Sequence, residues 1–138
     1  MDALNRKVDG KTLLREQCYV CWMTPTAAAP PSGKTAADIR AQHFAYLLEL
    51  ERSGVLFAAG PFVDETGVRH GAGMLLIRAA TRAEAETIAY AEPYTKAGMR
   101  QMTLTPWQRN EGALNLRIRF ADGVVEIDNR TYTLAPPA

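Results

Sequence analysis

The sequence predicts an α+β protein with a ferredoxin-like core, in which two helices pack on one face of a four-stranded antiparallel sheet. Two observations predict this fold. Segments of strand length and segments with helical spacing of apolar residues follow one another in the order strand, helix, strand, strand, helix, strand. The chain has 138 residues, which suits one hydrophobic core, and we expect an arm at 1–16, the core domain at 17–108 and a β-meander at 109–138.

The first strand and the first helix follow an arm that has no clear periodicity. The segment CYVCWMT is apolar on both faces and predicts the strand, and the Pro- and Ala-rich segment after it predicts a loop. Thr35 and Asp38 then resemble a capping box, which predicts the start of a helix. Apolar residues recur at helical spacing after this box, and Gly54 predicts the end of the helix.

The second half of the core is predicted to be a hairpin, a helix and a last strand. VLFAAGPF and GMLLIRA read as strands that the polar turn DETGVRHG joins. Thr81 and Glu84 form another capping box, and the helix that follows should stop before Pro93. MRQMTLTPW is polar at alternate positions, as an edge strand would be.

The remaining residues predict an appended β-meander, because apolar and polar residues alternate and Asp122 with Gly123 supplies a hairpin turn. Two of the predicted core strands are apolar on both faces, whereas two helices cover only one face. A second copy of the chain is the economical cover for the other face, so we expect a homodimer. The meander could instead cover that face within one chain.

Composition and charge exclude several classes of protein. With 47% hydrophobic and 22% charged residues, the chain reads as a globular protein rather than a disordered one. Its 16 Lys and Arg against 15 Asp and Glu give a net charge of +1, which argues against a nucleic-acid partner or an anionic membrane surface. The polar N-terminus and the lack of an 18-residue apolar run lead us to expect a cytoplasmic protein with no membrane partner.

Cys18 and Cys21 have a spacing that could suggest a redox or zinc site. On a strand, however, residues three apart point to opposite faces, and the sequence contains no second cysteine pair. We therefore expect two buried, reduced thiols and no metal site.

His43 and Glu92 are the residues that could carry chemistry. His43 lies on the apolar stripe of the first predicted helix, where it is either a hydrogen-bonded core residue or a general acid or base. Glu92 lies four residues after Ile88, so it continues the apolar face of the second helix and should be partly buried at the helix C-terminus. Both surroundings disfavour a charged carboxylate, so we expect a raised pKa for Glu92. The alternative is that Glu92 reaches solvent from a frayed helix end.

Other candidates are weaker. Trp22, Tyr46 and Tyr94 are candidate walls of a substrate pocket, although aromatic residues at such positions are often part of a core. His70 and Asp64 lie in a polar turn, where solvated residues are the norm. The sequence contains neither a GxGxxG nor a GxxxxGK[ST] phosphate loop, and no GxSxG motif.

Several segments resemble the YCII-related domain, a group of small dimeric α/β barrels similar in fold to muconolactone isomerase. The segments are HFAYLLELERSGVLFAAGPF, EPYTKAGM and TPW. The family pattern is a helix with H-x-x-[YF]-L, a strand that ends in a-G-P, an acidic residue before Pro followed by A-G, and a final P-W. The resemblance covers about residues 17 to 108. Two features depart from it: the acidic residue is usually Asp, whereas this chain has Glu92, and the meander is additional.

The resemblance implies a His and carboxylate pair, here His43 and Glu92, in a pocket near a dimer interface. One branch of the family is similar to dehydrochlorinases that act on chlorinated hydroxyquinols, which implies proton transfer. We therefore expect a lyase or isomerase that needs no cofactor and acts on a small cyclic or aromatic molecule. The alternative is a dimer that binds or senses a small ligand without turnover. RNA binding is disfavoured, because GMLLIRA lacks the exposed aromatics of an RNA-recognition strand.

Overall fold

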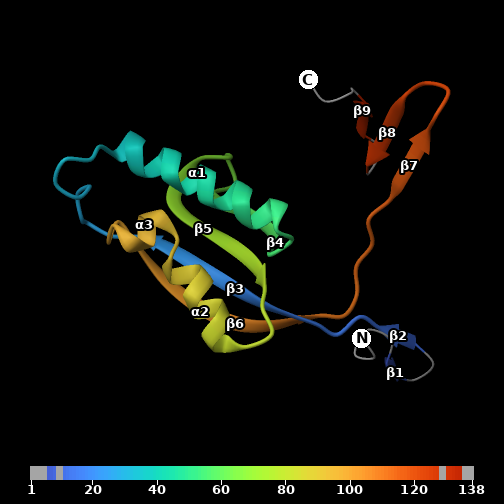
Figure 1. The fold of residues 1–138 in the computed structure, drawn as a ribbon, viewed down its shortest axis with the longest axis horizontal. Helices are drawn as coiled ribbons and strands as arrows, with labels where there is room; N and C mark the ends of the chain where they lie inside the picture. Colours follow the sequence, from blue (N-terminus) through green and yellow to red (C-terminus); the bar gives the residue numbers. More distant parts are fainter. Residues whose placement is uncertain (1–5, 9–10, 128–129, 135–138) are drawn as a thin grey trace.

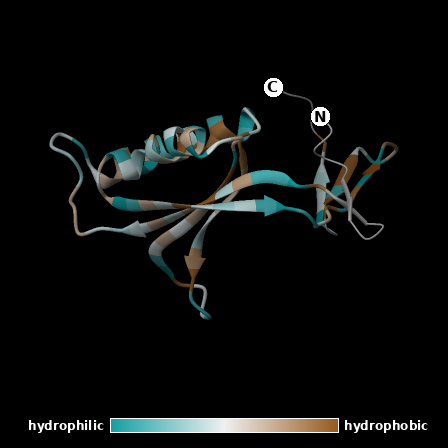
Figure 2. Ribbon diagram, turned by 90° about the horizontal axis from the view of Figure 1, so that it is seen from below, coloured by the Kyte–Doolittle hydropathy of each residue, from teal (hydrophilic) through white to brown (hydrophobic). Residues whose placement is uncertain are grey.

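The structure is a computed structural model that describes residues 6–8, 11–127 and 130–134. Its core is a four-stranded antiparallel sheet with helices on one face (Figures 1 and 2). The strands, in spatial order, are β4 (Leu56–Val63), β5 (Arg69–Arg78), β3 (Glu16–Pro25) and β6 (Arg100–Arg109). The helices are α1 (Ala36–Arg52), α2 (Arg82–Tyr90) and the short α3 (Pro93–Lys96). The predicted βαββαβ order and the ferredoxin-like fold are confirmed.

Strand β3 is central, and its register decides which side chains face the helices. Cys21 lies opposite Leu75 of β5 and opposite Leu104 of β6. Because side chains alternate along a strand, this register directs one set of apolar residues toward α1 and α2. The buried core that results consists of Tyr19, Cys21, Met23, Leu75, Ile77, Ala79, Ala85, Ala89, Met102 and Leu104.

The start of α1 follows the predicted capping box. The Thr35 hydroxyl accepts a hydrogen bond from the Asp38 backbone N–H at 3.2 Å, and an Asp38 carboxylate oxygen accepts one from the Thr35 N–H at 2.7 Å. The helix stops at Arg52, and Gly54 adopts a φ of +78°, the left-handed conformation that favours glycine after a helix. These local signals orient α1, so that Ile39 and His43 face the sheet.

The second helix ends before Pro93, as predicted, but the predicted placement of Glu92 on that helix is wrong. Helix α2 stops at Tyr90, and Ala91 is its C-cap. Glu92 then has an extended backbone and is the N-cap of α3, which begins at Pro93. A residue before proline avoids the helical region, whereas proline itself suits the first position of a helix. The Glu92–Pro93 pair therefore starts a new helix, and Glu92 does not continue the apolar face of α2.

Strands β4 and β5 form the predicted hairpin and pack closely at two glycines. A Cβ atom at Gly73 would lie 3.0 Å from the carbonyl oxygen of Gly60. The close approach of the two backbones therefore requires glycine at position 73. A Cβ atom at Gly60 would meet no atom of the described residues within 4 Å.

Both ends of the chain add small sheets. Strands β1 (Arg6–Val8) and β2 (Lys11–Leu13) pair antiparallel within the segment predicted to be an arm without regular structure. The predicted meander is present as β7 (Leu116–Arg119), β8 (Val124–Ile127) and β9 (Arg130–Thr133). Both views place it away from the four-stranded sheet, so it does not cover the face that lacks helices (Figures 1 and 2). The division at 16/17 and 108/109 stays a prediction.

The face of the sheet without helices carries exposed aromatic residues. Trp22 stacks on Phe62 with ring centroids 5.7 Å apart, and these side chains are 40% and 43% exposed. Trp107 belongs to the edge strand β6, where it lies opposite Cys18 of β3, and it is 41% exposed. We call this surface the open face and define it by Trp22, Phe62 and Trp107.

Candidate active site

A pocket of about 430 Å³ lies between the helices and the β4–β5 hairpin, on the helix side of the sheet. Its wall combines apolar side chains, exposed glycine backbone and a few polar groups. The lining residues are Met23, Arg40, His43, Phe44, Leu47, Ala59, Gly60, Pro61, Arg69, Gly71, Ala72, Gly73, Leu75, Tyr94 and Arg100.

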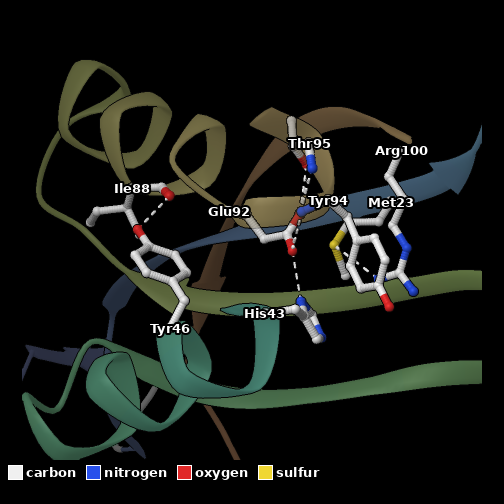
Figure 3. Close-up of polar contacts among 8 residues, drawn as sticks. All are labelled: Met23, His43, Tyr46, Ile88, Glu92, Tyr94, Thr95 and Arg100. Carbon is white, nitrogen blue, oxygen red and sulfur yellow. Dashed lines mark hydrogen bonds and ion pairs between the residues drawn. The ribbon is translucent and has the colours of Figure 1, made fainter. Parts of the chain in front are cut away.

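His43 reaches this pocket from the middle of α1. It lies four residues after the buried Ile39, on the stripe of the helix that faces the sheet, and it is 8% exposed. Its Nδ1 atom lies 2.6 Å from Oε1 of Glu92 (Figure 3). The structure therefore brings together the two residues that the sequence singled out.

Glu92 is fully buried and its carboxylate has several donors. Oε1 accepts a hydrogen bond from the Tyr94 backbone N–H at 3.0 Å, and Oε2 accepts one from the Thr95 N–H at 2.9 Å. The Thr95 hydroxyl donates to Oε2 at 2.8 Å. The carboxylate thus caps α3 and contacts His43 at the same time.

The expected rise in the pKa of Glu92 is wrong. Burial does raise it and is the largest single effect, but the hydrogen bonds from His43, Tyr94 and Thr95 together outweigh burial and hold the pKa of Glu92 below its ordinary value. The reason is the position of the residue. Glu92 accepts hydrogen bonds from free N–H groups at the start of α3 instead of facing the carbonyl end of α2.

The charged state of Glu92 fixes the tautomer of a neutral His43. A carboxylate can only accept hydrogen bonds, so Nδ1 of His43 must donate to it. Nε2 is then the unprotonated nitrogen, and Figure 3 shows it on the side of the ring away from Glu92. No group in the described part of the chain hydrogen-bonds to Nε2, and His43 lines the pocket. A bound molecule could therefore give a proton to this nitrogen.

Tyr94 is the predicted wall residue that does line the pocket. Its ring centroid lies 5.1 Å from that of His43. The Arg100 guanidinium lies 4.0 Å from the same tyrosine ring and donates to the Met23 thioether sulfur at 3.9 Å (Figure 3). Tyr94 therefore contacts both the imidazole of His43 and the cation of Arg100.

The other two predicted wall residues lie elsewhere. Trp22 belongs to the open face, because its position on β3 points it away from the helices, and its Nε1 donates to the Thr105 hydroxyl at 3.1 Å. Tyr46 donates its hydroxyl proton to the Ile88 carbonyl at 2.8 Å, which ties α1 to α2 (Figure 3). Neither residue is among those that line the pocket of this chain.

The remaining candidates do not form a second site. Cys18 and Cys21 are buried free thiols, as predicted, and burial raises the pKa of Cys21 to about 12. His70 is an exposed residue at the start of β5 and pairs with Asp64 of the preceding turn at 2.7 Å. Among the described residues, no group of three or more His, Cys, Asp and Glu is placed to hold a metal ion. No helix in those same residues has the length and hydropathy that a bilayer crossing requires.

Sequence reasoning missed the three arginines of the pocket. Arg40 lies three residues before His43, so helical spacing alone could have placed both on one side of α1. Arg69 and Arg100 stand at the first positions of β5 and β6. No sequence signal relates these two strand starts to α1, because only the folded sheet brings them together.

Comparisons with known proteins agree with the fold. The family model described as YCII-related domain matches residues 18–108, about two thirds of the chain. A similar solved structure is 5-chloro-2-hydroxyhydroquinone dehydrochlorinase from Burkholderia phenoliruptrix AC1100 in complex with 2,5-dihydroxybenzoquinone, with 23% identity and a TM-score of 0.51. The match covers 65% of this chain and 92% of the dehydrochlorinase chain, and it shows a shared fold. No curated protein matched the sequence.

Proposed function

The chain belongs to the YCII-related domain family, and from that premise we propose that its pocket is the active site of a cofactor-independent lyase or isomerase. The substrate is a small cyclic or aromatic molecule from which a proton is removed, or to which one is returned. His43 is the general acid and base, and Glu92 positions it. Tyr94 forms part of the substrate-binding wall.

One observation carries this proposal: the 2.6 Å contact between Nδ1 of His43 and Oε1 of the fully buried Glu92, with the second imidazole nitrogen turned away from Glu92 (Figure 3). A histidine that served packing alone would not need a buried carboxylate with three further donors. The carboxylate fixes the ring orientation and stabilises the imidazolium that forms when Nε2 takes a proton.

The reaction needs two steps on this nitrogen. In the first, Nε2 accepts a proton from a C–H or O–H group of the substrate, and the electron pair stays on the substrate. In the second, the imidazolium returns the proton to another atom of the substrate, or a leaving group departs with the electron pair and the imidazolium releases its proton to water. Well-placed acid–base catalysis contributes about 10² to 10⁴ in rate. The dehydrochlorinase of similar fold supports a ring compound as substrate.

Proton exchange tests this proposal without knowledge of the full reaction. The protein is incubated in D₂O with a panel of cyclic ketones, hydroquinones and hydroxyquinols, with and without a ring carboxylate, that includes 5-chloro-2-hydroxyhydroquinone and 2,5-dihydroxybenzoquinone. Proton NMR then follows loss of C–H signals and formation of products. We expect exchange or turnover of at least one compound, about 10² to 10⁴ times slower with His43→Gln and about 10 to 100 times slower with Glu92→Gln.

His70→Gln is the matched control, because His70 is an exposed residue of β5 that does not line the pocket. It should leave the rates unchanged. Full activity of His43→Gln contradicts the assignment of the site. A compound that raises the melting temperature but shows neither exchange nor turnover supports the alternative, a module that binds a small ligand.

We also propose that the protein is a homodimer and acts in the cytoplasm. The open face supports the dimer, since Trp22, Phe62 and Trp107 are each about two-fifths exposed and the meander lies elsewhere. The two free buried thiols are in keeping with a reducing compartment. Fractionation of the source cells would test the location.

A further inference from the structure

The pocket holds more positive charge than proton transfer by His43 requires. Arg40, Arg69 and Arg100 come from α1, β5 and β6, and all three line it. No Asp or Glu occurs among the described residues of the lining. Glu92 lies behind His43 and does not balance the arginines, because His43, Tyr94 and Thr95 already occupy its oxygens.

Arg100 is the innermost of the three cations and has weak partners only. It is half-buried, its guanidinium lies 4.0 Å from the Tyr94 ring centroid, and its hydrogen-bond acceptor is the Met23 sulfur at 3.9 Å. A guanidinium has five N–H donors, and a thioether is a weak acceptor. In the described part of the chain no carboxylate lies within ion-pair distance of Arg100, so its planar donor edge is available to a ligand.

Arg40 and Arg69 are exposed side chains of the pocket lining, and among the described residues neither has an ion-pair or hydrogen-bond partner for its side chain. Elsewhere on the sheet the protein does neutralise its arginines. Glu16 pairs with Arg109 at 2.6 Å and also with Arg78. The cations that face the pocket therefore differ from those of the opposite sheet face in having no internal counter-charge.

We propose that the substrate of this site carries a carboxylate, which Arg100 binds while Arg40 and Arg69 attract it from the mouth of the pocket. This inference rests on the proposed function, since it names the substrate class of the same pocket. Arginine matches the two oxygens of a carboxylate with paired donors. The apolar wall formed by Met23, Leu47 and Leu75 suits the ring that bears this group.

The position of the cations also selects among ring compounds. The Arg100 guanidinium lies 4.0 Å from the Tyr94 ring centroid, and the His43 ring centroid lies 5.1 Å from it. A carboxylate bound by Arg100 and a reacting atom at His43 would therefore occupy separate parts of one pocket. A neutral ring of the same size would fill the apolar part and leave Arg100 without its partner. Charge, more than shape, should therefore separate ligands from non-ligands.

Benzoate and benzamide test this inference, because they share ring and size and differ in charge. Each is titrated into the full-length protein labelled with ¹⁵N in histidine, and the imidazole signals report binding beside His43. We expect benzoate to bind at least about tenfold more tightly than benzamide. Arg100→Gln and Arg69→Gln should each reduce this preference, and added salt should weaken the binding of benzoate alone.

Arg52→Gln is the matched control, because Arg52 is an exposed arginine of α1 outside the pocket lining. It should keep the full preference for benzoate. Because Arg69 is exposed, Arg69→Gln should fold. The inference can therefore still be tested if Arg100→Gln does not fold. Equal binding of the two compounds, or binding of neither, overturns the inference. Preferential benzoate binding by the wild type, together with absent proton exchange, would uphold it and overturn the proposed enzyme.

Discussion

At the scale of single residues, Glu92 has the most unusual surroundings in the chain. Its carboxylate is fully buried and accepts four hydrogen bonds, from His43, from the Tyr94 N–H and from two groups of Thr95. Burying an ion is costly, and these donors offset that cost. The pKa of Glu92 is lower in the folded protein than its ordinary value, so the ionised form stabilises the fold.

The first residue-scale prediction concerns stability and pH. Because the folded-state pKa of Glu92 is depressed, its contribution is fully present above the ordinary glutamate value of 4.5 and is lost as the pH falls through the folded-state pKa. Glu92→Gln should cost about 2 to 3 kcal/mol of unfolding free energy at pH 7, and the difference from wild type should shrink below about pH 4. Urea unfolding at a series of pH values measures both. A difference that stays constant down to pH 3 contradicts the coupling.

At the scale of elements, local signals predicted most of the fold. Thr35 and Asp38 start α1 with a reciprocal pair of hydrogen bonds, and apolar strands of the expected length form the sheet. The start of α2 was also predicted, although Glu84 accepts from the Ala80 N–H rather than from that of Thr81. Such signals lie within three or four residues of one another, and so a single sequence displays them.

Where two local signals competed, the prediction was wrong. At Glu92 the apolar spacing of α2 favoured a continued helix, whereas the following Pro93 favoured a new start, and the proline decided the structure. The pocket arginines were missed for another reason. Arg69 and Arg100 reach the pocket of His43 only through strand pairing across the sheet, and no local pattern encodes that proximity. His43 was found because its stripe on α1 is local.

The prediction at the element scale uses the close approach of β4 and β5. Gly73→Ala places a Cβ atom 3.0 Å from the Gly60 carbonyl oxygen, so the two backbones must separate. We expect a loss of about 1 to 3 kcal/mol in unfolding free energy. Gly60→Ala is the matched control, since its Cβ atom meets no described atom within 4 Å, and it should change stability by less than about 1 kcal/mol. Equal melting temperatures for the two variants would show that the hairpin absorbs the added methyl group.

At the scale of the whole molecule, the helices lie on one side of the sheet (Figure 2). The pocket lies on that same side, and the open face lies on the other. Each of the three aromatic residues of the open face has about two-fifths of its surface exposed. An exposed aromatic sheet face is typical of an interface. The additional meander leaves this face accessible, so the proposed dimer does not conflict with the C-terminal extension (Figure 1).

The whole-molecule prediction is a dimer that a single charge disrupts. Light scattering after gel filtration should give twice the chain mass of 15.2 kDa. Trp22→Asp places a charge at the centre of the open face and should give the monomer mass with an unchanged far-ultraviolet spectrum. Phe120→Asp is the control, because Phe120 is 89% exposed and lies in the extension beyond β7. A wild-type monomer at micromolar concentration contradicts the proposed dimer.

The double use of the Glu92 carboxylate has an evolutionary consequence. The same oxygens that orient His43 also begin α3, the helix that carries Tyr94 into the pocket wall. A lineage that lost the proposed activity could not replace this acid freely, because the loss would disturb the local fold. Conservation of an acidic residue at position 92 in related chains is therefore weak evidence for the proposed activity. A substitution at position 43 is stronger evidence that this activity has been lost.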